Sequence, residues 1–361
     1  MNPLAADLDH ILAHTEGLWE ELRGQRLFIT GGTGFFGCWL LESFAWANDK
    51  LGLGAKAVVL TRNAEVFRNK VPHVASHPAI QFHIGDVQDF DFPAGSFSHV
   101  IHAATEANAK LSVENPLLVF ETIVAGTRRT LEFARHGGAR KFLLTSSGAV
   151  YGRQPPEITH LPETYPSGPA TDEPGSAYGE GKRAAEMLCT LYGHQFELEA
   201  KIARCFAFVG PYLPLDIHFA IGNFIRDAIV GDHIRVGGDG TPYRSYLYAA
   251  DLAIWLWHLL MRAQPGRAYN VGSAEAISIA DLAHAVARSV RPTAKITFGR
   301  VPEPGRPPTR YVPAIDRAQA ELGLAPTVPI AEAIRRTADW SRASGPHPAS
   351  TLRISATSSN Q

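Results

Sequence analysis

The chain predicts an α/β protein, built as a doubly wound parallel sheet with a smaller C-terminal lobe. Three observations point to this fold class. Short apolar runs alternate with segments of helical spacing through residues 25–205, which is typical of sheets covered by helices on both faces. A glycine-rich turn follows the first apolar run. Hydroxyl residues end a later run, at the edge where a parallel sheet binds its ligands.

The expected elements follow from the spacing of apolar residues. Apolar positions in residues 4–22 recur with helical period and predict a leading helix packed on the sheet. Strands are predicted at 26–29, 56–60, 80–84, 99–102, 141–145 and 200–205. Helices are predicted at 35–47, 116–136 and 176–192. A loop rich in Pro, Gly, Ser and Thr is predicted at 153–175.

The turn at residues 30–37, Thr-Gly-Gly-Thr-Gly-Phe-Phe-Gly, lies between the first strand and the first helix of the sheet. Glycines at 31, 34 and 37 let bare backbone approach a pyrophosphate and let the helix pack on the strand. The helix N-terminus then presents N–H groups and partial positive charge to the anion. The turn therefore predicts a dinucleotide site, the alternative being a glycine-rich turn without function.

Tyr178 and Lys182 stand four residues apart, one above the other on a helix face. A phenol with an ordinary pKa near ~10 is a poor base. A neighbouring ammonium favours the phenolate, as does an oxidised nicotinamide. Tyr178 can then take a hydroxyl proton while hydride leaves the same carbon, and Ser147, at a strand end, can donate to that oxygen. Taken alone, each feature also fits an ordinary surface pair or a polar strand end.

Composition excludes several function classes. The 361 residues carry a net charge of −1, so a nucleic acid is not expected as the main partner. The 3 cysteines are too few and too scattered for a disulfide framework or a metal cluster, which fits a reducing cytoplasm. No signal peptide is evident, and the most apolar run, residues 252–261, is too short to span a bilayer. A soluble cytoplasmic protein is expected.

Taken together, the glycine turn, the strand-end serine and the Tyr/Lys pair resemble the extended short-chain dehydrogenase/reductase family, the NAD(P)-dependent nucleotide-sugar epimerases and dehydratases. The resemblance covers about residues 25–340. It implies a Rossmann-type fold, a nucleotide-diphosphate sugar as partner, and a homodimer formed through helices 116–136 and 176–192. Other matching stretches are 85–87, 102–105, 204–211, 223–225 and 244–246.

The resemblance also implies a division of the chain and a set of site residues. Residues 1–24 carry the leading helix, 25–205 the Rossmann domain, 206–342 mainly the substrate-binding lobe with elements around 245–275 returning to the sheet, and 343–361 a disordered tail. Ser147, Tyr178 and Lys182 are the expected catalytic residues. Asn223, Arg244 and Arg306 are expected at the nucleotide sugar. The residues expected at the cofactor are Gly31, Thr33, Gly34, Phe35, Phe36, Gly37, Arg62, Asp86, Val87, Ala103, Ala104, Thr105, Tyr178 and Lys182.

Departures from the relatives narrow the reaction. Sugar 4,6-dehydratases carry an Asp-Glu pair just after the strand-end hydroxyl, where this chain has Gly148 and Ala149. Residues 178–186 look most like UDP-glucuronate decarboxylases, which use a glutamate in the place of Ala149. We therefore expect an epimerase that transiently oxidises sugar C4. The alternative is an NADPH-dependent 4-ketoreductase acting on 4-keto-6-deoxysugars, and less favoured are a dehydratase, a decarboxylase and a non-catalytic NADP(H)-sensing protein.

The end of the second predicted strand bears on the cofactor. NAD-preferring relatives place an acid there to hold the ribose 2′-hydroxyl. This chain has Leu-Thr-Arg-Asn at 60–63, without a carboxylate and with Arg62 able to meet a 2′-phosphate. NADP is therefore favoured slightly over NAD, the alternative being that Arg62 stacks on the adenine.

Overall fold

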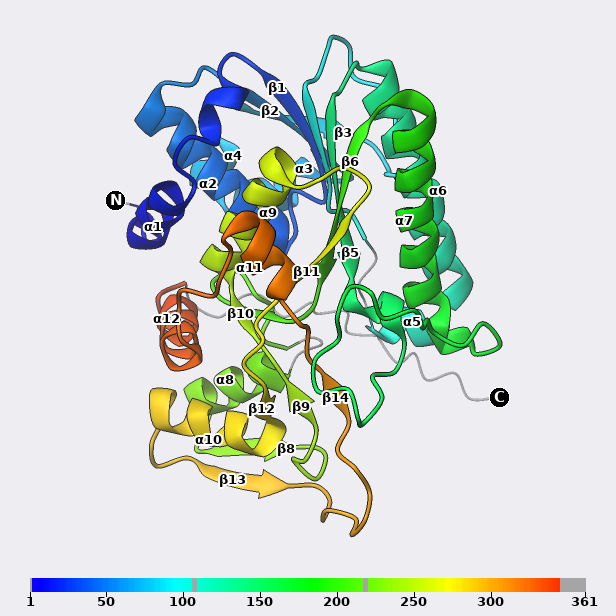
Figure 1. Cartoon of the computed structure of the whole chain (residues 1–361). Coiled ribbons are helices and arrows are strands. Elements are labelled where there is room, and N and C mark those ends of the chain that lie inside the picture. The colour runs from blue at the N-terminus through cyan, green and yellow to red at the C-terminus, as the bar shows by residue number, and fades with distance from the viewer. Residues whose placement is uncertain (1, 106–108, 217–219, 345–361) are drawn as a thin grey trace, which may run out of the picture.

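Seven strands form one sheet in the order β11-β6-β5-β4-β1-β2-β3 (Figure 1). The structure is a computed structural model and describes residues 2–105, 109–216 and 220–344. Every pair in this sheet is parallel. The chain moves outward from β1 to β3 and then returns to β4 on the other side of β1, which is the doubly wound topology. The strands are β1 Arg26–Thr30, β2 Lys56–Thr61, β3 Ile80–Ile84, β4 His99–His102, β5 Lys141–Ser147, β6 Glu199–Cys205 and β11 Ala268–Val271.

The two faces of the sheet bury separate apolar cores because successive side chains of a strand point to opposite faces. In β1, Leu27 and Ile29 enter one core and Phe28 enters the other. Likewise Leu143 of β5 enters the first core, while its neighbour Leu144 enters the second. These strands are apolar on both faces, as expected of a parallel sheet covered on both sides. The predicted α/β fold class is confirmed.

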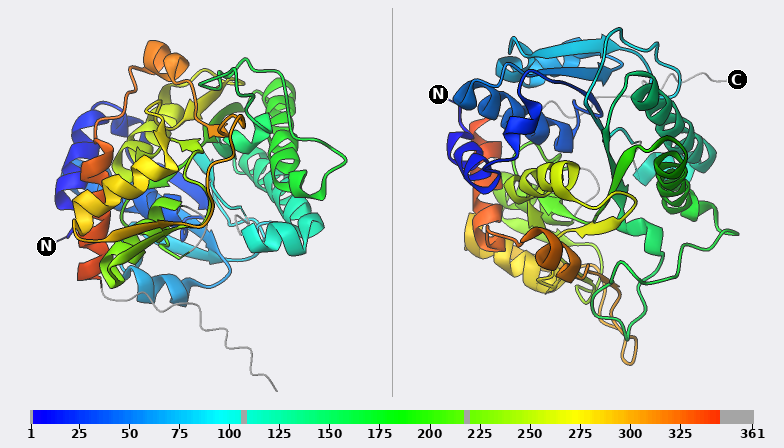
Figure 2. Two further views of the ribbon diagram at one scale, coloured as in Figure 1. Left: turned by 90° about the horizontal axis from the view of Figure 1, so that it is seen from below. Right: turned by 45° about the horizontal axis from the view of Figure 1, so that its top comes forward.

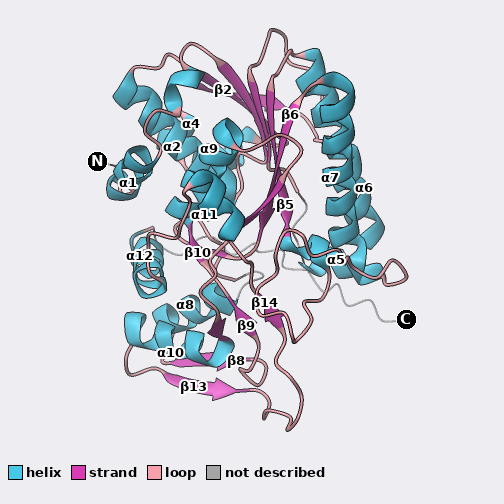
Figure 3. Cartoon of the chain, in the orientation of Figure 1, coloured by secondary structure: helices cyan, strands magenta, loops and turns pink. Residues whose placement is uncertain are grey.

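Different helices cover the two faces (Figure 3). α2 and α9 pack on the first face, with α1 across them, and α6 and α7 pack together on the second. The helices around the sheet are α1 Ala5–His14, α2 Phe35–Leu51, α3 Ala64–Lys70, α4 Pro72–Ala75, α5 Ala109–Glu114, α6 Pro116–His136, α7 Ala177–Phe196 and α9 Ala249–Arg262. The predicted helix 116–136 has the same bounds as α6. The predicted helices 35–47 and 176–192 each end four residues before the ends of α2 and α7.

The lobe beyond β6 consists of helices and short strands. Its small sheets are β10-β7, β12-β9-β14 and β13-β8. The helices are α8 Ala220–Val230, α10 Ile279–Val290, α11 Asp316–Leu322 and α12 Ile330–Ala343. The strands are β7 Phe208–Val209, β8 His233–Val236, β9 Tyr243–Arg244, β10 Leu247–Tyr248, β12 Ile277–Ser278, β13 Lys295–Phe298 and β14 Arg310–Tyr311. α9 and β11 return to the sheet, so the lobe is not continuous in sequence.

The leading segment differs from the single helix expected over residues 4–22. α1 ends at His14, and a 3₁₀ turn follows at Trp19–Leu22. The Thr15 hydroxyl donates to the carbonyl of Ile11 at 2.6 Å, and Gly17 has a φ of +74° that a helix does not allow. The periodic apolar residues on both sides of this break still pack on α2 and α9, which is why the sequence pattern looked continuous.

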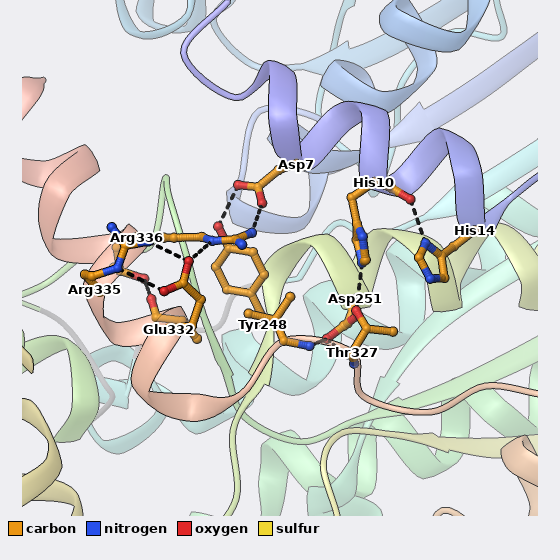
Figure 4. A network of polar contacts seen from close by, with 12 residues as sticks. Asp7, His10, His14, Tyr248, Asp251, Thr327, Glu332, Arg335 and Arg336 are labelled. Atoms are coloured by element: carbon orange, nitrogen blue, oxygen red, sulfur yellow. Dashed lines mark hydrogen bonds and ion pairs between the residues drawn. The ribbon is translucent and has the colours of Figure 1, made fainter.

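α1 is held against α12 and α9 by polar contacts that we call the anchor network: Asp7, His10, Tyr248, Asp251, Thr327, Glu332 and Arg336 (Figure 4). Asp7 receives hydrogen bonds from Arg336 at 2.5 Å and from the Tyr248 hydroxyl at 2.7 Å. Two further views show α1 and α12 side by side (Figure 2). The network therefore ties the leading helix to a helix more than three hundred residues later in the chain.

The tryptophans gather on this same side of the sheet. Trp19 packs on Trp257 with ring centroids 4.7 Å apart, and the Trp257 indole donates to the Ser43 hydroxyl. The 6 tryptophans of the chain lie in the 3₁₀ turn, α2, α9 and α12. None of them lies in α6 or α7.

Some expectations concern the ends and the general class of the chain. The tail expected to be disordered, residues 343–361, lies outside the described residues apart from its first two positions. Within the described part of the chain, every helix is too short or too polar to cross a bilayer. The same residues contain no group of three or more His, Cys, Asp or Glu side chains placed to hold a metal ion.

Candidate active site

The turn between β1 and α2 has the shape that a pyrophosphate requires. Gly31 has a φ of +71°, and a Cβ there would lie 2.4 Å from the carbonyl carbon of Ala103. A Cβ at Gly37 would lie 2.2 Å from Gly32, so the helix could not approach the strand with any side chain at that position. At Gly34 a Cβ would meet only the Gly31 carbonyl oxygen, at 3.4 Å, and would otherwise enter the open space beside the turn. The glycines therefore fit a bound dinucleotide.

The N-terminus of α2 faces the same space. Gly34 is its N-cap, in extended conformation, and no side chain of a described residue caps the helix there. The first N–H groups of a helix need a partner, and an anion can supply it. Thr33, Phe35 and Phe36 are partly exposed around this turn. Their placement is compatible with the predicted contact to a cofactor.

The end of β4 is fixed by buried hydrogen bonds to β1. The Thr30 hydroxyl lies 2.7 Å from Nδ1 of His102 and accepts from the backbone N–H of Ala104 at 3.2 Å. Burial lowers the pKa of His102 to about 3, and Lys182 adds to the lowering, so this ring stays neutral. The backbone at Ala103, Ala104 and Thr105 is thereby held beside the glycine turn.

The outer strands place the remaining cofactor candidates at the same edge. Arg62 directly follows β2 and is exposed, while its neighbour Asn63 caps α3 by accepting from Glu65 N–H at 3.0 Å. Asp86 follows β3 and accepts from the backbone N–H of Gln88 at 3.0 Å. Val87 lies next to it and is partly exposed. These residues share the carboxyl edge of the sheet with the glycine turn.

α7 is joined to the end of β5 by two buried contacts. Nζ of Lys182 donates to the carbonyl oxygen of Thr145 at 2.9 Å. One turn later, Glu186 accepts from the Ser146 hydroxyl at 2.6 Å and pairs with Arg204 at 2.7 Å. These contacts fix Lys182 with its ammonium 5.9 Å from the centre of the Tyr178 ring.

Four hydroxyl side chains meet beside this lysine, and we call them the hydroxyl cluster: Thr105, Ser147, Tyr178 and Tyr311. Burial raises the pKa of Tyr178, whereas the neighbouring hydroxyls of Ser147 and Thr105 act in the opposite direction. The Thr105 hydroxyl is buried and has no hydrogen-bond partner among the described residues. Burial also raises the pKa of Tyr311, and Ser147 again opposes the shift. Ser147 therefore lies close enough to influence both phenols, and both phenols keep their protons at neutral pH.

The sequence predicts that Lys182 and an oxidised nicotinamide together favour the phenolate of Tyr178, and the structure shows how much of this Lys182 can supply. Burial lowers the pKa of Lys182 to about 8, because the ammonium is taken out of water. The same desolvation raises the pKa of Tyr178. Lys182 and the two small hydroxyls do not by themselves make Tyr178 a base at neutral pH, so further positive charge at the site is needed for that role.

The predicted substrate residues lie in the lobe. Arg244 in β9 is the register partner of Tyr311 in β14, which places it next to the hydroxyl cluster. Asn223 in α8 lines a surface depression together with Arg226 and Arg235, and it accepts from Arg226 at 3.3 Å. Arg306 lies in an exposed loop and pairs with Glu303 at 3.1 Å. The structure thus joins Arg244 to the candidate site and leaves Arg306 pointing at another surface residue.

Comparison with known proteins places these features in a family. The model of the NAD-dependent epimerase/dehydratase family matches residues 27–272. The chain belongs to this family. This family consists of extended short-chain dehydrogenase/reductases, so the resemblance inferred from the motifs is confirmed.

Several members of the epimerase/dehydratase family are similar over most of the chain. UDP-glucuronic acid decarboxylase 1 of Xenopus tropicalis is 30% identical over 331 residues, covering 91% of this chain and 75% of that protein. The structure of UDP-glucose 4-epimerase from Thermotoga maritima with UDP-glucose has a TM-score of 0.74 at 20% identity, covering 88% of this chain and 99% of that one. The dTDP-glucose 4,6-dehydratase DesIV from Streptomyces venezuelae, with NAD bound, has a TM-score of 0.73 at 22% identity, covering 88% and 97%.

Sequence reasoning missed one member of the candidate site. Tyr311 belongs to the hydroxyl cluster, but its strand β14 has two residues and shows no periodicity. The pairing of Tyr311 with Arg244 is a contact between distant parts of the chain. The local signal was its position five residues after Arg306, which the sequence analysis expects at the nucleotide sugar.

Proposed function

We propose that this member of the epimerase/dehydratase family is an NAD(P)-dependent nucleotide-sugar epimerase that transiently oxidises sugar C4. The main support is that Ser147, Tyr178 and Lys182 lie close together at the end of β5. Ser147 is followed in the sequence by Gly148 and Ala149. With the positive charge of an oxidised nicotinamide added beside them, the first three groups can move a proton at a hydroxyl. Neither of the last two carries a carboxylate that could eliminate water or handle a carboxyl group.

In this mechanism Tyr178 takes the proton of the C4 hydroxyl, and Ser147 donates a hydrogen bond to the same oxygen. The nicotinamide cofactor supplies the acceptor, and later the donor, of the hydride from C4. Lys182 would hold the cofactor ribose, and it contributes positive charge next to the phenol. After the 4-keto-sugar has rotated in the site, Tyr178 would return the proton to the C4 oxygen. The configuration at C4 is then inverted, because the hydride would come back to the opposite face of C4.

The cofactor and the diphosphate are assigned by their chemistry. The cradle of Gly31, Gly34 and Gly37 and the uncapped start of α2 suit a pyrophosphate. Arg244, next to Tyr311, can hold the sugar diphosphate through its guanidinium. We assign Asn223 to the same diphosphate and Asp86, Val87, Ala103 and Ala104 to the cofactor, as the sequence predicts. A UDP-sugar is the first substrate to test, because the names of two of the relatives above carry UDP.

The second candidate is an NADPH-dependent 4-ketoreductase, which Arg62 favours. Its exposed guanidinium follows β2, where a ribose 2′-phosphate would lie. A net reductase consumes reduced cofactor, and NADPH is the usual donor for that purpose. Arg62→Asp is expected to move preference from NADP(H) to NAD(H), measured as the ratio of the two dissociation constants. An unchanged ratio contradicts the assignment of Arg62.

The deciding experiment is incubation of the protein with UDP-, GDP-, CDP- and dTDP-hexoses and with UDP-glucuronate, without added reductant. We expect an inverted sugar from at least one hexose, identified by NMR, and no product from Tyr178→Phe. Loss of CO2 from UDP-glucuronate would make the chain a decarboxylase despite Ala149. Oxidation of NADPH only with a 4-keto-6-deoxysugar would make it a reductase. The absence of any product would overturn the proposal.

We also propose a homodimer formed through α6 and α7. Several apolar side chains of these helices are exposed: Leu117 at 64%, Met187 at 59% and Leu191 at 51%. Large apolar groups gathered on a surface indicate an interface. Light scattering of the purified chain is expected to give twice the monomer mass, and Leu191→Glu with Met187→Glu is expected to give the monomer.

A further inference from the structure

Tyr311 is held rigidly beside the candidate active site. Its strand β14 pairs with β9, so that Tyr311 stands in register with Arg244. The next residue, Val312, accepts from the backbone N–H of Leu161 at 2.8 Å and donates to the Gln154 side chain at 3.0 Å. The Tyr311 ring packs on Phe206 with centroids 4.7 Å apart. The backbone and the ring are therefore both fixed, which leaves little freedom to the phenol oxygen.

The Tyr311 hydroxyl occupies the space that a side chain at position 148 would fill. A Cβ on Gly148 would lie 2.6 Å from the Tyr311 hydroxyl and 2.8 Å from the Phe206 ring. Gly148 directly follows Ser147, so the phenol oxygen reaches the immediate neighbour of the serine. The glycine and the tyrosine are complementary, because the absence of a side chain at one position admits the hydroxyl of the other.

We propose that Tyr311 is a positioning residue of the candidate active site: its hydroxyl donates to Ser147 and thereby directs the proton of Ser147 toward Tyr178. A serine hydroxyl has one proton and two acceptor sites. The backbone N–H of Ala149 already donates to one acceptor site of Ser147 at 3.1 Å. A bond from Tyr311 occupies the second site, and the proton of Ser147 is left for the oxygen of Tyr178 or of the substrate.

The charges around the two phenols support this direction of the hydrogen bonds. Burial raises the pKa of both phenols, so both keep their protons at neutral pH. Tyr311 takes no part in the proposed proton transfer, so it keeps its proton throughout and can act as the donor. The charged or titratable groups that face the two phenols come from separate elements. They are Lys182 on α7, Cys205 on β6 and Arg244 on β9. Burial raises the pKa of Cys205 to about 12, so at neutral pH this thiol adds no negative charge that would change the order of donation.

The test measures the titration of Tyr178 in the full chain without any substrate. Tyrosine labelled with ¹³C at Cζ reports the ionisation of each phenol by NMR, and Tyr178→Phe identifies the signal of Tyr178. In Tyr311→Phe, which keeps the ring and loses the hydroxyl, we expect the midpoint of Tyr178 to rise by about half a unit to one unit. The reason is that Ser147 then donates less firmly to the phenolate. An unchanged midpoint would overturn the proposal.

Two further variants separate positioning from a general loss of packing. Gly148→Ala keeps the Tyr311 hydroxyl but pushes it away from Ser147, and the same upward shift of Tyr178 is expected. In a Ser147→Ala background, Tyr311→Phe should shift the midpoint no further, since the effect passes through the serine. A shift of equal size in that background would mean that Tyr311 acts on Tyr178 by another route, and would contradict the proposal. Circular dichroism checks that each variant is folded.

The consequence for turnover rests on the proposed function and is read separately. If the chain epimerises a nucleotide sugar, Tyr311→Phe should lower kcat about tenfold and change KM less than about twofold. The acidic limb of its pH profile should move upward together with the NMR midpoint. If the limb stays in place while kcat falls, the hydroxyl acts only through structure. If no nucleotide sugar is turned over at all, the proposed function fails, and the titration still decides the role of Tyr311.

Discussion

The anchor network and the hydroxyl cluster are both sets of polar groups centred on buried side chains, Asp7 in one and Ser147 in the other, and they are built in opposite ways. In the anchor network a carboxylate meets a cation: Asp7 accepts from Arg336 and from the Tyr248 hydroxyl within 2.5–2.7 Å. In the hydroxyl cluster the partners are neutral, and the adjacent Lys182 donates to a backbone carbonyl. Paired charges lower each other's desolvation penalty and stabilise packing. Neutral hydroxyls beside a cation keep protons that can be exchanged.

The largest expected difference between the two regions is in turnover. Tyr178→Phe removes the proposed proton carrier, and we expect the rate to fall about 10³-fold, or about 4 kcal/mol in barrier height. Its unfolding free energy should stay within about 1 kcal/mol of the wild type, because the ring is kept. The measurements are product formation and urea unfolding. A variant that retains more than a tenth of the activity would contradict the assignment.

The anchor network should show the reverse pattern. Asp7→Ala leaves the Tyr248 hydroxyl without its acceptor and leaves Arg336 with Glu332 alone, and we expect a loss of about 2 kcal/mol in unfolding free energy. This figure is below that of a fully buried pair because Arg336 is about a third exposed. Turnover of the folded variant should be unchanged below its melting temperature. Asp9→Ala, on the exposed side of α1, is the matched control: it loses only a solvent-exposed hydrogen bond from the Trp46 indole at 2.8 Å and should cost less than about 1 kcal/mol.

The pH dependence of stability sharpens the comparison through Lys182. Its pKa is about 8 in the folded chain and near 10.5 when unfolded, so the unfolded state binds more protons between these values. The contribution of Lys182 to stability therefore rises with pH from about 8 to about 10.5 and is lost as pH falls through 8. The slope is at most about 1.4 kcal/mol per pH unit. Subtracting the curve of Lys182→Met isolates it, and a flat difference would refute the shift.

The smallest effect is expected on the exposed side of the anchor network. Arg335 pairs with Glu332 at 2.6 Å and with Asp339 at 3.1 Å, but Arg335 and Asp339 are exposed and Glu332 is only partly buried. Exposed pairs of this kind contribute little, so Arg335→Ala should cost less than about 0.5 kcal/mol. Thermal unfolding at low and high salt measures it. A loss as large as that of Asp7→Ala would mean that burial is not what separates the two sets of contacts.

The sequence predicts the sheet well because its signal is local. Alternating cores, as at Leu27 and Phe28, come from apolar runs that a reader can see, and the glycine turn and the pair Tyr178–Lys182 are motifs of fixed spacing. What the sequence does not reveal depends on distant pairing. Tyr311 is brought beside Gly148, the neighbour of Ser147, by a two-residue strand. The break after α1 depends on Thr15 and Gly17, which apolar periodicity does not register.

The effect of burial on the pKa values of Tyr178 and Lys182 could not be predicted from the sequence either. The spacing of Tyr178 and Lys182 is compatible with a primed phenolate, yet burial moves the two pKa values toward their neutral forms. Only the depth of both side chains beneath β5 and β6 reveals this. The sequence likewise could not show that Arg244 lies beside Tyr311, whereas Asn223 lines a surface depression and Arg306 pairs with Glu303. These positions depend on how the lobe folds back toward the sheet.

The placement of the tryptophans has a consequence for observing this molecule. Because the tryptophans belong to the 3₁₀ turn, α2, α9 and α12, tryptophan fluorescence reports on the side of the sheet that carries α2. It does not report directly on α6 and α7, which contain no tryptophan. A loss of signal on heating would therefore record the melting of one half of the protein. The substitution Tyr192→Trp, beside Phe196 in α7, would place a fluorescent reporter in the other half of the protein. Comparing its melting curve with that of the native tryptophans would show whether both halves unfold as one cooperative unit.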